Sequence, residues 1–391
     1  MTVKRIAIIA GEPSGDVLAA GVIRELKLLY PDAVFEGIGG KHMQAEGFVS
    51  LYDMDSLSVM GLVEVLKHLP TLLSIRKSIK QHFVNNPPDV FVGVDAPDFN
   101  LSIETYLKKQ GIKTVHYVSP TVWAWREKRI YKIINACDLV LGIFPFEKAI
   151  YDKYKHCYQY VGHTMADAID ISPDFNSFRE MFSLKMEQKC LALLPGSRAK
   201  EVASLLPVFL QTATLLIKKL GLDKSEHLKV IIPAANKARA SQIHSIIEAS
   251  DTPFDLQVTE KSAREVMLAS DAVLLASGTA SLEAMLCKKP MVVTYKMSTL
   301  TYKIMKRLYK PNYFALPNIL ADKLLVPELL QEDVNPELMC KQLALYLNDE
   351  YKLTQLPKLI DEFNNIHSRL RLGADKKSAE AIQRLLENTA K

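Results

Sequence analysis

Short, strongly apolar runs alternate along this chain with longer stretches in which apolar residues recur every three to four positions. The runs are rich in valine, isoleucine, leucine and phenylalanine, and they predict strands buried on both faces, as in a parallel sheet. The longer stretches predict amphipathic helices. The expected strands lie at 5–11, 34–40, 89–95, 113–119 and 139–144 in one group, and at 190–197, 229–235, 254–259, 272–278 and 290–295 in another.

This alternation divides the chain into two similar parts. Strands separated by helix-length segments predict βαβ units, so the expected fold class is α/β with parallel sheets. The length of 391 residues fits two domains, and the polar stretch 165–190 lacks strand character. We therefore expect two Rossmann-like domains facing a cleft, at 1–170 and 185–335, and a helical tail at 336–391 that packs back on the first domain.

Composition favours a protein of the cytoplasm. Hydrophobic residues make up 48% of the chain and charged residues 24%, as in ordinary globular proteins. The five cysteines are scattered and form no C-x-x-C pair, which argues against a disulfide framework or a structural zinc and for a reducing compartment. The N-terminal apolar run is too short for a signal peptide, and no segment is expected to reach the ~20 apolar residues of a membrane span.

Positive charge is concentrated in one segment of the second part. No acidic residue occurs between Glu283 and Asp322, whereas seven cations fall there. Such a segment favours an anionic partner, namely phosphate groups, nucleic acid or an acidic lipid surface, although a solvated basic face would have the same composition. The cations are Lys288, Lys289, Lys296, Lys303, Lys306, Arg307 and Lys310.

A turn with anion-binding character follows the strand at 190–197. In LLPGSRAKEV, Gly196 lets the backbone approach a ligand closely, and the N–H groups at the start of the helix after Ser197 form an anion site. Arg198 adds a planar cation suited to phosphate oxygens. The pattern matches neither the dinucleotide nor the Walker fingerprint, and an ordinary helix cap would use the same residues.

A second turn of this kind follows the strand expected at 272–278. Ser277, Gly278 and Thr279 join a buried strand to a helix, and Glu283 stands one turn into that helix. A capping box from Thr279 would need its acid at position 282, which is leucine, so capping does not explain Glu283. A carboxylate behind a phosphate-binding helix start is well placed to accept hydrogen bonds from sugar hydroxyls. Together the two turns predict a nucleoside diphosphate site.

Carboxylates also follow two strands of the first part. Asp95 and Asp98 lie in VGVDAPDFN at the end of a strand, where open α/β sheets place their ligand crevice. Capping of the loop or the following helix would explain either residue without any chemistry. In GEPSGD, at the end of the first strand, Glu12, Ser14 and Asp16 are weaker candidates for catalysis or for binding hydroxyl groups.

Two patterns that suggest a metal are disfavoured. Asp53 and Asp55 form a D-x-D triplet of the kind that holds a metal–diphosphate in some glycosyltransferases, but they lie in a polar loop and not behind a clear strand. The histidines show no H-x-x-x-H or H-E-x-x-H spacing, so no zinc site is expected. We predict that the protein uses neither a metal nor another cofactor.

An unusually apolar segment with basic neighbours runs from residue 56 to residue 80. Pro70 interrupts it, and Arg76 and Lys80 are among the cations beside it. A pair of wholly buried helices is one interpretation, and a surface for acyl chains or a membrane is the other. The residues predicted to make the latter contact are Val59, Met60, Leu62, Leu66, Leu69, Leu72 and Leu73.

Eight motifs, taken in order, resemble those of lipid-A-disaccharide synthases. They are GEPSGD, VGVDAPDFN, HYVSPTVWAWR, FPFEKAIYDKY, VGHTMADAI, LLPGSR, LLASGTASLE and LPNILA, and the resemblance extends from about Arg5 to the last helices. Each motif is short, but eight in register make an accidental match rare. The resemblance implies an inverting, metal-independent glycosyltransferase of the GT-B fold from a Gram-negative bacterium.

The resemblance also implies substrates and a location. Enzymes of this family join UDP-2,3-diacylglucosamine to 2,3-diacylglucosamine 1-phosphate (lipid X), release UDP and form the β-1',6-linked precursor of lipid A. They act at the cytoplasmic face of the inner membrane, so we expect peripheral attachment to an anionic membrane surface and no nucleic-acid partner. The oligomeric state stays open, with a homodimer as one option.

Residue by residue, the resemblance assigns UDP to the second domain and the acyl-sugar acceptor to the first. Arg198 would stabilise the charge that develops on the leaving diphosphate. Asp95 would take the proton of the attacking acceptor hydroxyl, with Asp98 as the alternative base. The residues expected to bind UDP are Gly196, Ser197, Arg198, Ser277, Gly278 and Thr279 at the diphosphate, Glu283 at the ribose, and Asn318 in LPN at a further position.

Two other functions are compatible with the same patterns. A different GT-B enzyme, such as a UDP-sugar 2-epimerase, would act on a soluble UDP-sugar and would need no second sugar. A two-lobed binding protein without catalysis is the other, but Glu283 and Asp95 would then be superfluous.

Overall fold

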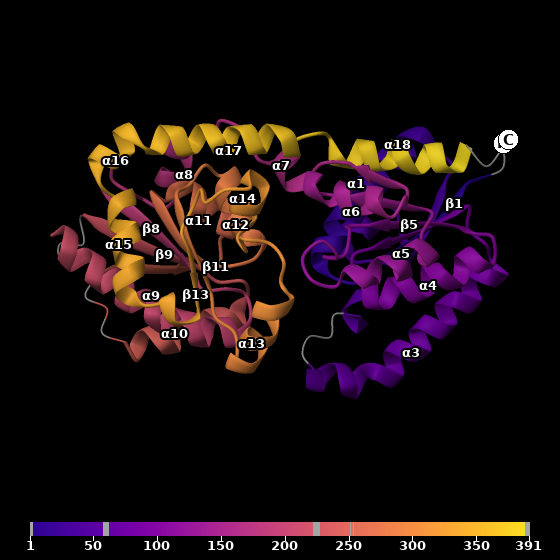
Figure 1. Ribbon diagram of the computed structural model, residues 1–391, viewed down its shortest axis with the longest axis horizontal. Coiled ribbons are helices and arrows are strands. Elements are labelled where there is room, and N and C mark those ends of the chain that lie inside the picture. The colour runs from indigo at the N-terminus through magenta and orange to yellow at the C-terminus, as the bar shows by residue number, and fades with distance from the viewer. Residues whose placement is uncertain (1–2, 58–61, 222–226, 251, 253, 388–391) are drawn as a thin grey trace. The chain divides into compact units, whose positions relative to one another are not determined.

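The computed structural model describes residues 3–57, 62–221, 227–250, 252 and 254–387, without the side chains of residues 62–68. The chain forms two units (Figure 1). The first consists of Met1–Asp167 and Leu370–Lys391, and the second of Ala168–Arg369. Each unit has its own sheet and its own hydrophobic core.

The first unit contains a sheet of seven parallel strands. They are β1 (Arg5–Ala10), β2 (Val34–Ile38), β3 (Val49–Tyr52), β4 (Val90–Val94), β5 (Lys113–Tyr117), β6 (Leu139–Gly142) and β7 (Tyr158–Tyr160). Their order is β3-β2-β1-β4-β5-β6-β7. The helices are α1 (Pro13–Leu29), α2 (Lys41–Ala45), α3 (Leu62–Asn85), α4 (Pro97–Lys109), α5 (Ile130–Ala136), α6 (Lys148–Lys153), α7 (Thr164–Ala168) at the boundary, and α18 (Ala374–Glu387). One core cluster joins the sheet to α1 and α18 and another joins it to α3 and α4, so the central strands are buried on both faces.

The second unit contains six parallel strands. They are β8 (Lys189–Leu194), β9 (Leu228–Pro233), β10 (Asp255–Thr259), β11 (Ala272–Ala276), β12 (Met291–Tyr295) and β13 (Glu328–Leu330), in the order β10-β9-β8-β11-β12-β13. The helices are α8 (Phe175–Met181), α9 (Ala199–Leu220), α10 (Lys237–Glu248), α11 (Ala263–Ala269), α12 (Thr279–Leu286), α13 (Thr299–Leu308), α14 (Leu316–Ala321), α15 (Pro336–Tyr346), α16 (Asp349–Thr354) and α17 (Leu356–Leu370). Helices α9, α10 and α15 pack together beside the sheet, and α11 packs against α8 and α12.

All ten strands expected from the sequence are present, and the α/β fold class is confirmed. The apolar pattern did not reveal β3, β7 and β13. These strands are only three or four residues long and lie at sheet edges. An edge strand is partly exposed, so it needs no continuous apolar run.

The C-terminal tail joins the first unit later than the sequence suggested. Residues 336–369 belong to the second unit, where α15 packs against α9 and contributes to the core. Only the segment from Leu370 onward groups with the first unit, where α18 packs against α1 (Figure 1). Asp167 fixes the start of α18 by accepting the N–H groups of Gly373 (2.9 Å) and Ala374 (2.7 Å).

Helix α9 corrects the expectation that no segment is long and apolar enough for a membrane span. It has 22 residues and is the single such helix among the described residues. Half of its most apolar window is buried, and Val202, Leu206 and Phe209 lie in the core of the second unit. A long core helix meets the same criteria as a span, so α9 by itself says nothing about membranes.

The apolar segment near residue 60 contributes to one long helix rather than to a pair. Helix α3 continues through Pro70, and its C-terminal half packs in the core of the first unit. Leu69 and Leu73 are 41% and 45% exposed, and Leu72 is half-buried. Val59 and Met60 lie outside the described residues, as do the side chains of Leu62 and Leu66. The role of this segment as a surface for acyl chains stays a prediction.

Candidate active site

Both sheets reverse their strand order at one point, and the turns singled out in the sequence lie there. In the first sheet β1 lies beside β4, so the turns that begin at Gly11 and Asp95 are neighbours. In the second sheet β8 lies beside β11, which brings together the turns that begin at Pro195 and Ser277. Open α/β sheets bind ligands at such a switch point, outside the carboxyl ends of the strands. Each unit therefore has its own candidate site.

In the first unit, the backbone leaves β4 through two residues in the left-handed conformation. Asp95 and Ala96 have φ angles of 50° and 42°, which costs a non-glycine residue roughly 1–2 kcal/mol. The surroundings hold this strain: the N–H of Asp95 donates to the carbonyl of Tyr117 (2.8 Å), and its carbonyl accepts from the side chain of Asn100 (2.9 Å). The half-buried Asp95 carboxylate has no hydrogen-bond or ion-pair partner among the described residues. It is therefore available to act as a base.

Asp98 differs from Asp95 in each of these respects. It lies in the first turn of α4, its side chain is 88% exposed, and it pairs with the guanidinium of Arg129. Asp98 and Arg129 line a cavity of about 280 Å³ beside α4 and α5, together with Lys132. The geometry favours Asp95 over Asp98 as a base, and a catalytic role for either residue stays a prediction.

The turn after β1 contains both accessible and buried polar residues. Glu12 precedes α1 and Ser14 is exposed in its first turn, so both remain candidates for binding an acceptor. The Asp16 side chain is 1% exposed and accepts three backbone N–H groups at the start of α2, at 2.9–3.0 Å. The Asp16 carboxylate thus holds α2 in place, and its binding of a ligand hydroxyl stays a prediction.

The end of β5 carries backbone strain that the sequence did not reveal. Val118 has a φ of 74°, which is rare for a β-branched residue. With Asp95 and Ala96 it puts three left-handed residues at the carboxyl ends of two adjacent strands. Such strain clusters at functional sites. Nothing in the local sequence marks a valine as left-handed, so only the structure could find it.

In the second unit, the turn after β8 passes through glycine and ends in exposed polar residues. Gly196 has a φ of 108°, and Ser197 and Arg198 are exposed. Glu201 accepts from the N–H of Arg198 (3.2 Å) and from its guanidinium (3.2 Å). A Cβ at position 196 would lie 2.4 Å from the Glu201 carboxylate. Glu201, which the sequence analysis missed, thus occupies the helix start at which an anion is predicted, and a diphosphate would compete with it.

The turn after β11 has a similar build. The N–H of Ser277 donates to β12 (2.7 Å), Gly278 has a φ of 151°, and Thr279 opens α12. One turn on, Glu283 Oε1 accepts from Nε of Arg264 at 3.0 Å. Arg264 is a second residue that the sequence analysis missed, because it lies on α11 and not beside any motif. Its pairing orients the Glu283 carboxylate, whose contact with ribose stays a prediction.

Asn318 belongs to the frame of the second unit and not to an accessible surface. Its side chain is fully buried and donates to the carbonyl of Val326 (2.9 Å) and to Glu328 (2.8 Å). Its carbonyl accepts two backbone N–H groups just before β13, at 2.8 and 3.0 Å. These hydrogen bonds use the side-chain amide in positioning this segment, and a contact of Asn318 with UDP stays a prediction.

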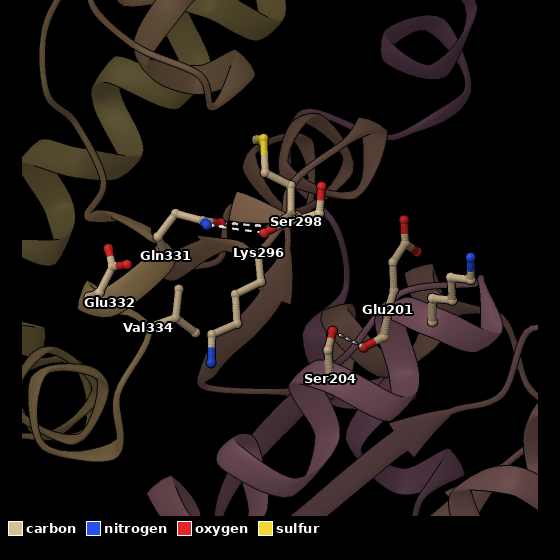
Figure 2. A pocket seen from close by; sticks show the side chains of 9 residues that line it. Glu201, Ser204, Lys296, Ser298, Gln331, Glu332 and Val334 are labelled. Atoms are coloured by element: carbon tan, nitrogen blue, oxygen red, sulfur yellow. Dashed lines mark hydrogen bonds between the residues drawn. The ribbon is translucent and has the colours of Figure 1, made fainter. Parts of the chain in front are cut away.

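A cavity of about 570 Å³ adjoins the first turns of α9 (Figure 2). Gln331 joins the loops on its far side: its side chain accepts the N–H of Met297 (2.8 Å) and donates to the Met297 carbonyl (3.0 Å), from a backbone with a φ of 56°. The cavity lies at the carboxyl edge of the sheet, so it can extend an anion site at the Gly196 turn. Its lining residues are Lys200, Glu201 and Ser204 from α9, Lys296, Met297 and Ser298 after β12, and Gln331, Glu332 and Val334 after β13.

The basic segment after Glu283 does not form one surface. Lys288 and Lys289 are only 4% and 8% exposed, and the Lys288 ammonium lies 2.6 Å from Nδ1 of His367. The alternative of a solvated basic face does not hold for the whole segment, since its first two cations are packed inside the second unit. The cations from Lys296 onward are exposed.

The groups that suggest metal binding form hydrogen-bonded structures. Asp53 accepts the N–H of Asp55 (2.9 Å) and caps a short turn. Within the described parts of the chain, one buried cluster has ligand-type side chains: Glu104, His116 and Cys137. Nδ1 of His116 and Sγ of Cys137 lie 2.7 and 3.2 Å from the Glu104 carboxylate, whereas ligands around a tetrahedral zinc are separated by roughly 3.3 Å or more. These contacts are hydrogen bonds, and the expectation that no metal is used stays a prediction.

Solved structures with the same architecture define the class of protein. The glycosyltransferase of kitacinnamycin matches 98% of this chain and 99% of its own, with a TM-score of 0.63 and 12% identity. The UDP-GlcNAc 2-epimerase of Neisseria meningitidis, solved with UDP-GlcNAc, matches 98% of this chain and all of its own, with a TM-score of 0.59 and 14% identity. At such identities the likeness concerns the fold alone. The fold is that of the GT-B class, as the sequence predicted.

Sequence comparison identifies the family within this class. The model of the lipid-A-disaccharide synthetase family matches residues 6–382. The chain is 54% identical to the lipid-A-disaccharide synthase of Alteromonas mediterranea over 97% of each chain. It is 48% identical to that of Pasteurella multocida over 99% of this chain and 97% of the relative. The chain belongs to the lipid-A-disaccharide synthase family, so the resemblance found in its motifs is confirmed.

Proposed function

We propose that this protein transfers 2,3-diacylglucosamine from its UDP donor to 2,3-diacylglucosamine 1-phosphate, with inversion at the anomeric carbon and release of UDP. One observation supports assigning a different role to each unit. The base candidate Asp95 lies at the switch point of the first sheet, and the glycine turns with Arg198 lie at that of the second. Glycosyl transfer needs a base for the acceptor hydroxyl and donors for the leaving diphosphate, and each switch point offers one of these.

The second unit is proposed to bind the UDP-sugar. The starts of α9 and α12 lie at neighbouring strand ends, and free N–H groups at a helix start favour an anion. Negative charge grows on the diphosphate as it leaves, and preorganised donors lower the barrier to that step. Arg198 would exchange Glu201 for the diphosphate, which is the more highly charged hydrogen-bond acceptor.

The first unit is proposed to bind the acceptor and to supply the base. A sugar hydroxyl is a poor nucleophile at neutral pH, so it needs a base within hydrogen-bond reach. Asp95 takes the proton of the acceptor 6-hydroxyl while the oxygen attacks the anomeric carbon of the donor and the bond to UDP breaks. Glu12 and Ser14, in the neighbouring turn, are proposed to orient the acceptor.

Release of UDP from UDP-2,3-diacylglucosamine tests this function. With lipid X present, we expect UDP and the disaccharide 1-phosphate in equal amounts, and without it no UDP. Excess chelator should leave the rate unchanged, because the proposed charge stabilisation comes from Arg198 and the helix starts. Loss of activity that magnesium restores would instead implicate Asp53 and Asp55. An epimerised UDP-sugar formed without an acceptor would contradict glycosyl transfer and favour a 2-epimerase.

We also propose that the protein attaches peripherally to an anionic membrane surface on the cytoplasmic side. Helix α13 supports this location. Leu300, Ile304 and Leu308 recur every four residues and are 72%, 49% and 46% exposed. Lys303 and Arg307 lie beside this stripe and are exposed too. An exposed apolar stripe next to cations is typical of a helix that lies in the headgroup region of an anionic bilayer.

Sedimentation with lipid vesicles tests the attachment. Vesicles with anionic lipids should bind the protein, and salt should release part of it, because each cation near the surface contributes about 1 kcal/mol that salt screens. Serine at Leu300, Ile304 and Leu308 should weaken binding, whereas serine at Leu345 and Leu353, which are exposed on α15 and α16, should not. Equal binding by both variants would exclude α13 as the contact. A wild-type protein that stays in solution at low salt would contradict the peripheral location.

A further inference from the structure

The second unit has a further cavity, of about 580 Å³, at the amino edge of its sheet. Lys189 opens β8, Asp271 directly precedes β11, and Lys289 comes just before β12, and all three line the cavity. All strands of this sheet are parallel. The cavity therefore lies at the edge opposite to the turns proposed to bind UDP, and the proposed function does not use it.

Four cations line this cavity around one inner carboxylate. Asp271 is bound by Arg179 (3.3 Å) and by Lys352 (3.0 Å), and it also accepts the N–H of Cys190 (2.8 Å). Lys189 donates to the carbonyl of Leu347, and its ammonium lies 3.5 Å from the exposed Asp349 carboxylate. The other lining acids, Glu187 and Asp349, are exposed. The charge of Asp271 is thus already offset by Arg179 and Lys352. The four cations that line the cavity outnumber its three acids.

Lys289 is the cation that the protein itself leaves unsatisfied. The residue is 8% exposed, and its ammonium lies 3.8 Å from the ring centre of Phe175. Its Nζ has neither a hydrogen bond nor an ion pair with any residue that the structure describes. Burial lowers its pKa to about 8, although Asp271 acts in the opposite direction. A charge without a partner at such a poorly exposed position is costly, and the cation–π contact offsets only part of that cost.

We propose that this cavity binds a phosphate group, with the Lys289 ammonium as its central donor. A phosphate carries up to two negative charges and several acceptor oxygens, so it can bind Lys289 together with Lys189 and Lys352 and leave the Asp271 pairs in place. A volume of several hundred cubic ångströms fits a phosphate-bearing small molecule or the phosphomonoester headgroup of a lipid. The bound phosphate would supply the counter-charge that Lys289 lacks.

Titration calorimetry with inorganic phosphate tests this site in an Arg198→Ala background, which weakens any phosphate binding at the opposite edge of the sheet. We expect one saturable site. Adding Lys289→Met, which removes the charge but keeps an apolar stem, should weaken binding at least tenfold. Adding Lys358→Met, at an exposed position on α17 outside the cavity, should leave binding unchanged.

Thermal unfolding provides a second readout that does not depend on activity. Phosphate should raise the melting temperature of the Arg198→Ala protein and of its Lys358→Met derivative, but not that of the Lys289→Met derivative, because a ligand stabilises only a folded state that binds it. In phosphate-free buffer, Lys289→Met should be at least as stable as its parent, since it no longer buries an unpaired charge. This comparison separates loss of the site from loss of the fold.

The source of the phosphate is distinguished with vesicles that contain either a phosphomonoester lipid or only neutral lipids. Binding of free phosphate supports a small-molecule ligand, and Lys289-dependent binding to the phosphomonoester vesicles alone supports a headgroup. The proposal is overturned if the Arg198→Ala protein binds neither probe. It is also overturned if Lys289→Met binds both as tightly as its parent.

Discussion

The carboxyl edges of the two sheets share a strand order but differ in backbone and charge. In the first, the chain leaves β4 through Asp95 and Ala96, both non-glycine residues with positive φ, and the Asp95 carboxylate is unpaired among the described residues. In the second, the turns pass through Gly196 and Gly278, and the acid Glu283 is paired with an arginine. The first edge thus has an unpaired acid on strained backbone, whereas the second has its turns on permissive glycine backbone with Arg198 exposed beside them.

The proposed function would account for this difference. A base must stay in one position and keep its lone pairs available, and a rigid, strained turn fixes a carboxylate better than a flexible one. A phosphate is bound by many N–H groups at once, so the backbone itself must approach it, and only glycine allows that without a clash. At position 196 the closest neighbour of an added Cβ would be Glu201, at 2.4 Å.

The largest effect is expected from Asp95→Asn. The amide keeps the shape of the side chain but is not basic, so turnover should fall by roughly 10²–10⁴ while affinity for the UDP-sugar changes little. Turnover and equilibrium binding of UDP-sugar are the measurements. Asp98→Asn is the matched control, because Asp98 is exposed and paired with Arg129. If the Asp98 variant is inactive and the Asp95 variant fully active, Asp98 and not Asp95 is the base.

Arg198→Ala should lower turnover by about 10²–10³, because it removes a preorganised positive charge from the leaving diphosphate. Unlike Asp95→Asn, it should also weaken binding of UDP, which calorimetry can measure. Lys218→Ala, at an exposed position in the last turn of α9, is a control that removes one cation far along the same helix. Near wild-type turnover of the Arg198 variant would contradict the proposed role of the second unit.

The two units are also expected to respond in opposite ways to pH. In the first, Glu147 is 2% exposed, and burial raises its pKa from 4.5 to about 8, so the folded chain holds more protons than the unfolded chain between these values. Its contribution to stability is complete below pH 4.5 and is lost as pH rises through 8. In the second, burial lowers the pKa of Lys289 from 10.5 to about 8, so its contribution is complete above 10.5 and is lost as pH falls toward 8.

Glu147→Gln tests the first half of this contrast. The amide oxygen can still accept from the N–H of Phe144 and the hydroxyl of Tyr158, but it cannot ionise. The variant should therefore gain on the order of 4 kcal/mol over the wild type at pH 8 and little at pH 4.5. Urea unfolding at a series of pH values measures this difference. An equal offset at both pH values would indicate a packing effect rather than titration.

The smallest effect is expected from Ala96→Gly. Glycine relieves a left-handed conformation that costs alanine roughly 1–2 kcal/mol, and it gives back part of that gain as chain entropy. The net free energy of unfolding should rise by up to about 1 kcal/mol, while turnover falls a few-fold because the Asp95 turn is less rigid. Gly373→Ala, on positive-φ backbone outside the site, should do the reverse and destabilise the fold. Lower stability of Ala96→Gly would show that the turn is not strained.

Much of the fold could be predicted because its determinants are local. Apolar runs of five or six residues mark the central strands, and the turns at 195–198 and 277–279 are recognisable from glycine and serine after such a run. The short edge strands and the packing of α15 were not predictable in this way. They depend on which neighbour a half-exposed segment finds, and that neighbour is far away in the sequence.

The sequence by itself determined two parallel α/β units, the turns at their switch points and the family. Strand periodicity, turn residues and motif order are properties of consecutive residues, so they can be recognised without the structure. Only the tertiary structure decided which polar residues remain available for chemistry. Asp16 and Asp95 both follow apolar strands, yet one is consumed by backbone N–H groups at residues 40–43 and the other has no partner among the described residues. In the same way, the Asn318 amide is hydrogen-bonded within the second unit, whereas the Lys289 ammonium has no hydrogen-bond partner among the described residues. Hydrogen-bond partners from distant segments make this choice, and they meet only in the folded chain.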